Sequence, residues 1–152
     1  ACERRLLQET LRYAVSMIKR TILFRILTLV YLVAVGFLCF GNFGGWPEVQ
    51  RVILGIPTDK LVHFLMFVPF TFLAFWSFSK ADKAGIGKTM LTLLALFALG
   101  CLIAWGTEVV QGKLPYRTFD VKDFRADRIG LACGTIVTFV VQSIISRKKA
   151  DA

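Results

Sequence analysis

The hydrophobic residues of the chain form four long runs that contain no Asp, Glu, Lys or Arg: 26–46, 61–79, 89–107 and 129–146. Each run has about the length of the roughly 20 apolar residues, with a range of 17 to 25, that an α-helix needs to cross a bilayer. A soluble bundle would show polar positions recurring along one helix face, and 91–105 shows no such recurrence. The pattern therefore predicts an all-α fold, a bundle of four transmembrane helices.

The residues before the first run predict a separate N-terminal feature. Residues 1–20 are basic, and an apolar stripe at helical spacing indicates an amphipathic helix on the membrane surface; a basic tail without structure is the alternative. Six basic residues precede the first run, and no small-residue cleavage site follows it, so it is not a signal peptide. We expect two parts, the segment 1–20 and a membrane domain at 21–149. The stripe consists of Leu7, Leu11, Ala14 and Ile18.

Composition supports a membrane protein. The hydrophobic content is 56%, the mean hydropathy is +0.64 and there are 14 Phe, more than an ordinary soluble domain carries. Of the four cysteines, Cys39, Cys101 and Cys133 fall inside the apolar runs, and no C-x-x-C spacing occurs. We interpret them as small packing residues and not as a disulfide or metal framework.

The basic residues indicate how the helices are oriented, because cytoplasmic segments are enriched in Lys and Arg. Residues 1–25, 80–88 and 147–152 together hold twelve cations and four acids, a net charge of +8, whereas the other two connections hold seven cations and six acids. We therefore expect both termini to be cytoplasmic. The overall charge of +9 follows from this topology, so we expect the lipid bilayer and no nucleic acid as a partner.

Polar residues gather in two segments, 59–63 (DKLVH) and 108–130. With four spans and cytoplasmic termini, the first segment begins the second span on the outer face. The second segment leaves the third span and enters the fourth on that same face. The topology alone thus places both segments at one end of the bundle, and we expect them to form one site.

The first segment pairs a carboxylate with the single histidine of the chain. Asp59 lies one helical turn before His63, on the same face, where it would orient the imidazole and raise its basicity. The alternative is structural: Asp59 caps the helix, Lys60 extends toward the membrane surface and His63 makes one interhelical hydrogen bond. Ionisable groups at the hydrocarbon edge are costly and often functional.

The second segment carries most of the acids. Glu108 and Gln111 share a face at the end of the third span, and a short connection with Arg117 and Asp120 follows. On the fourth span, acids and glycines are spaced four, three and four residues apart, so both acids point into the seam that the small residues create. This stripe consists of Asp123, Asp127, Gly130 and Gly134.

These residues resemble the VanZ-like family of small bacterial membrane proteins over about half of the chain, from Asp59 to Gly134. The family pattern usually has Asn where this chain has Asp127, which keeps the size and adds a potential charge. The resemblance implies a bacterial cytoplasmic membrane protein linked to resistance to the glycopeptide teicoplanin. The matching residues are Asp59, Lys60, His63, Phe64, Glu108, Gln111, Arg117, Asp120, Asp123 and Gly130.

Two functions are compatible with the pattern. The first is an outward-facing site that binds or processes a cell-envelope or glycopeptide-related molecule, with or without catalysis. Its acid–base residues would be His63, Glu108 and Asp123. Its ligand-binding residues would be Asp59, Lys60, Gln111, Arg117, Asp120 and Asp127.

A third function, a transporter, is disfavoured because no span has a charge at its middle.

The second function is a non-enzymatic accessory or adaptor protein, in which the same residues form an ion-pair network that stabilises the bundle. We expect no cofactor. His63 together with three acids could also hold a divalent metal ion, but no recognised metal-ligand spacing supports one, so no metal ion is expected. A single site requires His63 near Glu108, and Arg117 folded back over the acids near Asp123.

Overall fold

The structure is a computed structural model that describes residues 2–42, 52–53, 55–78 and 85–150. The described residues form the helices α1 (Cys2–Phe40), α2 (Thr58–Phe78), α3 (Ile86–Gln111) and α4 (Val121–Ala150). Each of them is long and apolar enough to cross a membrane. The prediction of an all-α bundle with four spans is thereby confirmed, and the chain is a multi-pass membrane protein.

A short hairpin precedes α2. Strand β1 (Val52–Ile53) pairs antiparallel with β2 (Ile56–Pro57). Gly55 between them has φ 80°, a backbone conformation that glycine adopts without steric cost. Because α2 begins directly after β2, the hairpin lies beside the first turn of α2, where Asp59 stands. A carboxylate in the first turn interacts favourably with the helix dipole.

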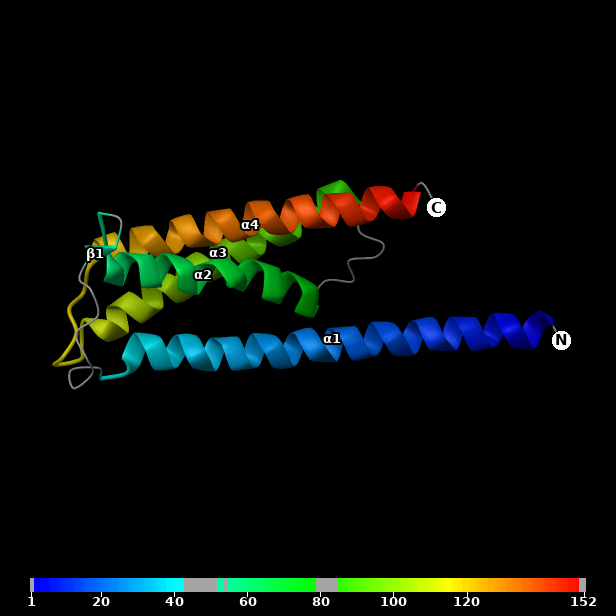
Figure 1. Ribbon diagram of the computed structural model, residues 1–152, viewed down its shortest axis with the longest axis horizontal. Coiled ribbons are helices and arrows are strands. Elements are labelled where there is room, and N and C mark those ends of the chain that lie inside the picture. The colour runs from blue at the N-terminus through cyan, green and yellow to red at the C-terminus, as the bar shows by residue number, and fades with distance from the viewer. Residues whose placement is uncertain (1, 43–51, 54, 79–84, 151–152) are drawn as a thin grey trace.

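Helix α2 is central, and its closest partner is α4 (Figure 1). A Cβ atom at Gly130 would collide with the backbone carbonyl of Phe64, and one at Gly134 with that of Val68. The glycine face predicted for the fourth span therefore brings two helix backbones into direct contact. Helix α3 closes the other side of α4, where Leu131 packs against Gly100.

Successive helices run in opposite directions along the bundle (Figure 1). Both chain ends lie at one end of the molecule, whereas the starts of α2 and α4 and the last turns of α1 and α3 lie at the other (Figure 1). We call the latter the loop end and the former the terminal end. The start of α1 and the end of α4 thus lie at the same end of the bundle, and the side of the membrane that this end faces stays a prediction.

Helix α1 lies along the outside of the bundle and is much longer than a bilayer crossing requires. Its 39 residues extend about 58 Å at 1.5 Å per residue, against about 30 Å of hydrocarbon. The segment 1–20, expected as a separate surface helix, continues into the first span within this one helix from Cys2 onward. Its position on the membrane surface stays a prediction.

Each helix begins before its charge-free run, because those runs mark only the stretch without charges. The first span was expected to reach residue 46, but α1 ends at Phe40. Residues 43–46, like Lys80 and Lys83 of the basic connection, lie outside the described residues.

The core consists of two apolar clusters around α2. One surrounds Phe67 and Leu131, and contains Cys39 of α1; the other surrounds Phe75 and Leu93. Cys39, Cys101 and Cys133 are free thiols. For the thiol of Cys39 the interpretation as a packing residue holds, since it is buried among these side chains.

Candidate functional site

The loop end gathers the polar side chains of both sequence segments. They come from the start of α2, the last turn of α3, the connection 112–120 and the start of α4. His63 Nδ1 lies 3.8 Å from Glu108 Oε1, and His63 Nε2 lies 3.8 Å from Asp123 Oδ2. The two segments, 45 or more residues apart in sequence, therefore meet at one place.

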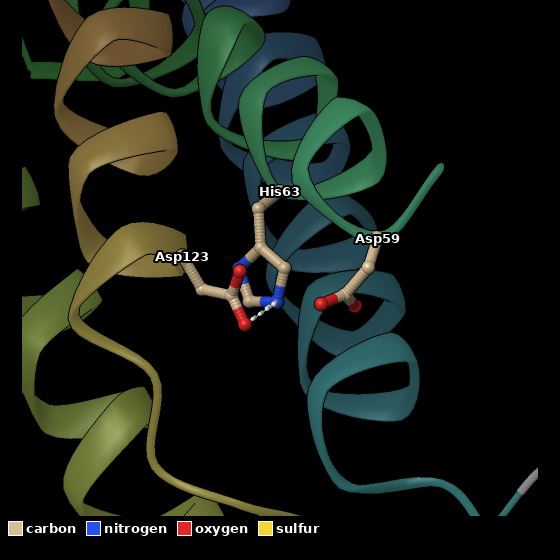
Figure 2. A group of neighbouring side chains, drawn as sticks. All are labelled: Asp59, His63 and Asp123. Atoms are coloured by element: carbon tan, nitrogen blue, oxygen red, sulfur yellow. Dashed lines mark ion pairs between the residues drawn. The ribbon is translucent and has the colours of Figure 1, made fainter. Parts of the chain in front are cut away.

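His63 is the centre of this arrangement and is only 5% exposed. Its Nδ1 makes a hydrogen bond of 3.0 Å with Asp127 Oδ1, while its Nε2 faces Asp123. Figure 2 shows the ring between Asp123 on one side and Asp59 on the other. Carboxylates from two helices thus flank the imidazole, Asp59 from α2 and Asp123 from α4. The carboxylate that holds its orientation, that of Asp127, also comes from α4.

The hydrogen bond that fixes His63 comes from Asp127 on α4 and not, as the spacing suggested, from Asp59 on α2. The side chain of Asp59 is 55% exposed, because Cα–Cβ bonds tilt toward the helix N-terminus and this residue stands in the first turn. Asp127 is fully buried. Spacing within one helix identified a neighbour of His63, but the contact between α2 and α4 supplies the hydrogen bond.

Lys60 joins α2 to α4 and to the connection before it. Its ammonium group lies 2.7 Å from Asp120 Oδ2 and also forms an ion pair with Asp123 Oδ1. The hydrogen bond from Lys60 holds the pKa of Asp120 below its usual value. Lys60 therefore stabilises the ionised form of a carboxylate at the start of α4.

Asp120 has a second task that sequence reasoning missed. Its Oδ1 accepts the backbone N–H of Lys122 at 2.8 Å, which makes Asp120 the N-cap of α4. The sequence contains the signal for such a cap. An Asp just before a helical run, with another acid three residues later, commonly starts a helix, and Asp120 and Asp123 have this spacing. This cap fixes the direction in which α4 leaves the connection.

Glu108 is fully buried at the end of α3. Its Oε2 accepts the backbone N–H of Asp120 at 3.3 Å, and its Oε1 points toward His63. Among the described residues, Glu108 Oε1 and Asp127 Oδ2 are buried oxygens without a hydrogen-bond partner. Two carboxylates beside one imidazole thus have acceptor capacity that the described residues do not use.

The last carbonyls of α1 are held by the site, which sequence reasoning also missed. The final four carbonyls of a helix lack partners within it, and those of α1 are all satisfied. Phe37 O accepts the N–H of Gly41 at 2.8 Å, and Cys39 O accepts Gln111 Nε2 at 2.9 Å. Leu38 O accepts Arg117 Nη2 at 3.1 Å, and Phe40 O accepts the Tyr116 hydroxyl at 3.0 Å.

Arg117 has a contact that was not expected, because its guanidinium donates to the negative end of the α1 dipole. It also lines one pocket together with Asp59 and Asp123, and its expected position over the acids stays a prediction. That pocket has a volume of about 200 Å³ and opens at the loop end. Its lining residues are Asp59, His63, Gln111, Tyr116, Arg117, Thr118 and Asp123.

Two groups of side chains have the donor atoms and the spacing to hold a metal ion. One consists of Asp59, His63 and Asp123, and the other of His63, Glu108 and Asp127; within each group the ligand atoms lie within 4.8 Å of one another. Neither has a local spacing in the sequence that signals a metal, because each draws on two or three helices. The sequence-based expectation of no metal rested on such spacings.

Comparison with known proteins gives a family and one relative. The family model VanZ/LLP1 matches residues 8–142. An uncharacterized protein of the fission yeast Schizosaccharomyces pombe is 33% identical over 82 residues, which are 54% of this chain and 47% of that protein. The chain thus spans about half the length of the curated relative that it matches, and relatives are not confined to bacteria. No solved structure matches.

Proposed function

The chain belongs to the VanZ/LLP1 family, and we propose that its loop end is an outward-facing site that binds the polar part of a cell-envelope or glycopeptide-related molecule. The observation that carries this proposal is the pocket of about 200 Å³ at the loop end. One guanidinium, one imidazole and two carboxylates converge on it. In a membrane protein such a concentration of ionisable groups costs stability and is often functional.

The size of the pocket limits the ligand. Pockets that enclose a drug-sized molecule have volumes of about 300 to 1,000 Å³, so 200 Å³ fits a head group and not a whole glycopeptide. Arg117 provides a planar donor for a carboxylate or phosphate, and Asp59 and Asp123 accept hydrogen bonds from hydroxyl or amine groups. The ligand is therefore an amphiphile or a peptide end whose remainder stays in the lipid or in water.

If the site also processes its ligand, the chemistry is acid–base catalysis by the two groups that reach the pocket. His63 and Asp123 both line it, and His63 Nε2 lies 3.8 Å from Asp123 Oδ2. Glu108 lies behind His63 and does not line the pocket; the hydrogen bond with Asp127 positions the imidazole. Ligand contact is thus proposed for two of the three predicted acid–base residues, and the third, Glu108, lies 3.8 Å from the imidazole without contacting the ligand.

The orientation in the membrane is part of this proposal. The excess of Lys and Arg near both termini favours cytoplasmic termini, and the loop end lies opposite them (Figure 1). In a bacterial cytoplasmic membrane, the pocket then faces the cell envelope. Labelling of cysteines introduced at Lys113 and at Lys88 tests this: reagents added outside intact cells should reach position 113 and not position 88.

One observation favours the second candidate, an accessory protein without a ligand. Lys60 connects α2, the connection 112–120 and α4 through ion pairs with Asp120 and Asp123, as a structural network would. That network and a binding site predict different effects of the same substitution. A structural residue changes stability and phenotype together, whereas a ligand contact changes the phenotype alone.

The experiment uses Arg117→Gln, with Arg125→Gln as the matched control, since Arg125 is exposed on α4. Each variant is expressed in a glycopeptide-sensitive bacterium, and the teicoplanin concentration that stops growth is compared with the melting temperature of the purified protein. A hydrogen bond to a charged group contributes about 1.5 to 3 kcal/mol, so Arg117→Gln should weaken ligand binding by about 10- to 100-fold.

We expect Arg117→Gln to lose the resistance that the native chain confers, while its melting temperature falls only by the small amount that the loss of one exposed hydrogen bond to Leu38 O causes. Arg125→Gln should keep both. Equal resistance in cells with the native chain and with Arg117→Gln would contradict the binding proposal. A loss of resistance in proportion to a loss of folded protein would favour the accessory role.

A further inference from the structure

Beneath the pocket lies a second arrangement, formed by one nitrogen and two carboxylates from three helices. His63 comes from α2, Glu108 from α3 and Asp127 from α4, and all three are at least 95% buried. Their ligand atoms lie within 4.8 Å of one another. Because every helix of the central three contributes one group, the arrangement exists only in the folded bundle.

The distances suit a small cation. His63 Nδ1 lies 3.0 Å from Asp127 Oδ1 and 3.8 Å from Glu108 Oε1. Ligands about 2.1 Å from a metal ion are separated by about 3.0 Å at octahedral angles and about 3.4 Å at tetrahedral angles. A shift of the Glu108 carboxylate oxygen by about 0.4 Å toward His63 Nδ1 brings the larger separation into this range.

The unused oxygens provide an independent reason to place a ligand here. Glu108 Oε1 and Asp127 Oδ2 are fully buried and accept no hydrogen bond among the described residues. A buried ionised carboxylate is strongly unfavourable unless it is paired or bound to a metal. Lys60 does not fill this role in the described residues, since its ion pairs are with Asp59, Asp120 and Asp123.

Charge balance leads to the same result. Two ionised carboxylates and a neutral imidazole carry a net charge of −2, and protonation of the imidazole leaves −1. One divalent cation neutralises the group completely while the imidazole stays neutral, the form in which it binds metals.

We propose that His63, Glu108 and Asp127 form a site for one divalent transition-metal ion. An imidazole suits Zn²⁺ and related ions, whereas carboxylates also suit Mn²⁺, so the mixed donor set selects this class over Mg²⁺ and Ca²⁺. Three protein ligands leave at least one coordination position open. The inference does not depend on what occupies the pocket, because the ion has its own ligands.

The surroundings complete such a site. The second ring nitrogen of a metal-bound histidine commonly faces a carboxylate that orients the ring, and His63 Nε2 faces Asp123 (Figure 2). An ion also needs a path to its ligands. The pocket is lined by His63, so one of the three proposed ligands borders the space through which an ion would enter.

The test measures Mn²⁺ binding to the full chain, purified in detergent with an affinity tag that contains no histidine and stripped of metals. Mn²⁺ is the probe because it binds thiolates poorly, which removes the cysteines as competing ligands. Electron paramagnetic resonance counts bound Mn²⁺ and detects a directly bound imidazole nitrogen. His63 is the single histidine of the chain, so that nitrogen signal has one source.

The substitutions Glu108→Gln and Asp127→Asn remove ligand charge with little change in size, and Asp59→Asn is the matched control from the exposed group. We expect one Mn²⁺ per native chain with an imidazole signal. Even the loss of groups that only orient a ligand costs 10- to 100-fold in metal affinity, so each ligand substitution should cost at least about 10-fold. Asp59→Asn should bind as the native chain does.

Three results would overturn the inference: no saturable Mn²⁺ binding by the native chain, bound Mn²⁺ without the imidazole signal, or loss of binding in Asp59→Asn but not in Glu108→Gln. The last would place the ion in the outer group of Asp59, His63 and Asp123. The measurements on the native chain and on Asp59→Asn stay decisive even if a buried substitution prevents folding. Growth assays with teicoplanin are not needed, so the outcome is separate from that of the pocket proposal.

Discussion

At the loop end of the bundle Lys60 is paired with carboxylates of Asp120 and Asp123, whereas at the terminal end Arg20 lies 4.1 Å from the centre of the Trp76 ring. Arg25, five residues further along α1, donates to the backbone carbonyl of Ser77 at 3.3 Å. Cations thus lie near both ends of α2. At the terminal end they contact an aromatic face and a helix carbonyl, which is how cations commonly anchor a helix at an interface.

The comparison shows that the loop end contains buried carboxylates that are not needed to anchor a cation. Aromatic rings and carbonyls hold a cation without burying an acid, so the terminal end avoids the cost of desolvated carboxylates. The loop end buries Glu108, Asp123 and Asp127 around one imidazole. Ion pairs that are buried contribute little net stability compared with apolar packing, which makes ligand binding the better reason for their presence.

The largest loss of stability is expected from a substitution in the contact between α2 and α4, on which both ends of the bundle depend. Gly134→Leu places a side chain where the carbonyl of Val68 already lies, and overpacking against backbone should lower the free energy of unfolding by at least about 3 kcal/mol. Thermal unfolding in detergent measures this. Gly106→Ala is the control because a Cβ there meets no atom within 4 Å; a native melting temperature for Gly134→Leu would refute the close contact.

Removal of Lys60 should affect the loop end alone. Lys60→Met leaves Asp123 buried without its cation, and we expect a loss of about 2 kcal/mol, below the value for a fully buried pair because Asp120 is partly in water. The matched control is Lys122→Met, since Lys122 is exposed on α4. If chemical unfolding shows the same small change for both, the ion pairs of Lys60 do not hold the loop end together.

A smaller effect is expected where the site holds α1. Gln111→Leu removes the donor to the Cys39 carbonyl, and an unsatisfied buried carbonyl costs about 1 to 2 kcal/mol. The end of α1 should then separate more often, which exposes the buried Cys39 thiol. Maleimide labelling read by peptide mass spectrometry should show faster modification of Cys39, and no change in Gln8→Leu, whose glutamine is exposed. Equal rates would show that Gln111 does not hold α1.

The smallest effect is expected at the terminal end. Arg20→Met removes the cation over Trp76, a contact that contributes about 0.5 to 1 kcal/mol at exposed sites. Arg12→Met serves as the control, since Arg12 lies on the exposed part of α1. Melting curves of Arg20→Met and Lys60→Met sharpen the comparison of the two ends; a larger loss from Arg20→Met would reverse it.

Much of the fold follows from the sequence because it depends on length and charge. Four runs without charges require four helices, and short connections between them require alternating directions. Both polar segments must then share one end, whichever way the side chains turn. The stripe from Asp123 to Gly134 also follows from helical periodicity, and its glycines do contact α2.

Periodicity within one helix could not identify partners on another. Asp59 was the nearest acid to His63 in sequence, yet Asp127 makes the hydrogen bond, because the glycine contacts set the rotation of α4 about its axis. The bond from Arg117 to the carbonyl of Leu38 was not expected either. The last carbonyls of α1 have no partners within their own helix. Their need for donors from other elements cannot be read from a count of charged residues.

The sequence by itself determined the number of helices, their direction and the end of the bundle at which the polar residues collect. Only the tertiary structure decided that Glu108 and Asp127 are buried beside His63, each with one oxygen that accepts no hydrogen bond from the described part of the chain, while Asp59 is exposed. The physical reason is that hydropathy and helical period place a residue along a helix and on one of its faces. Which faces meet depends on backbone contacts such as that of Gly130 with Phe64, and these exist only once the helices have packed.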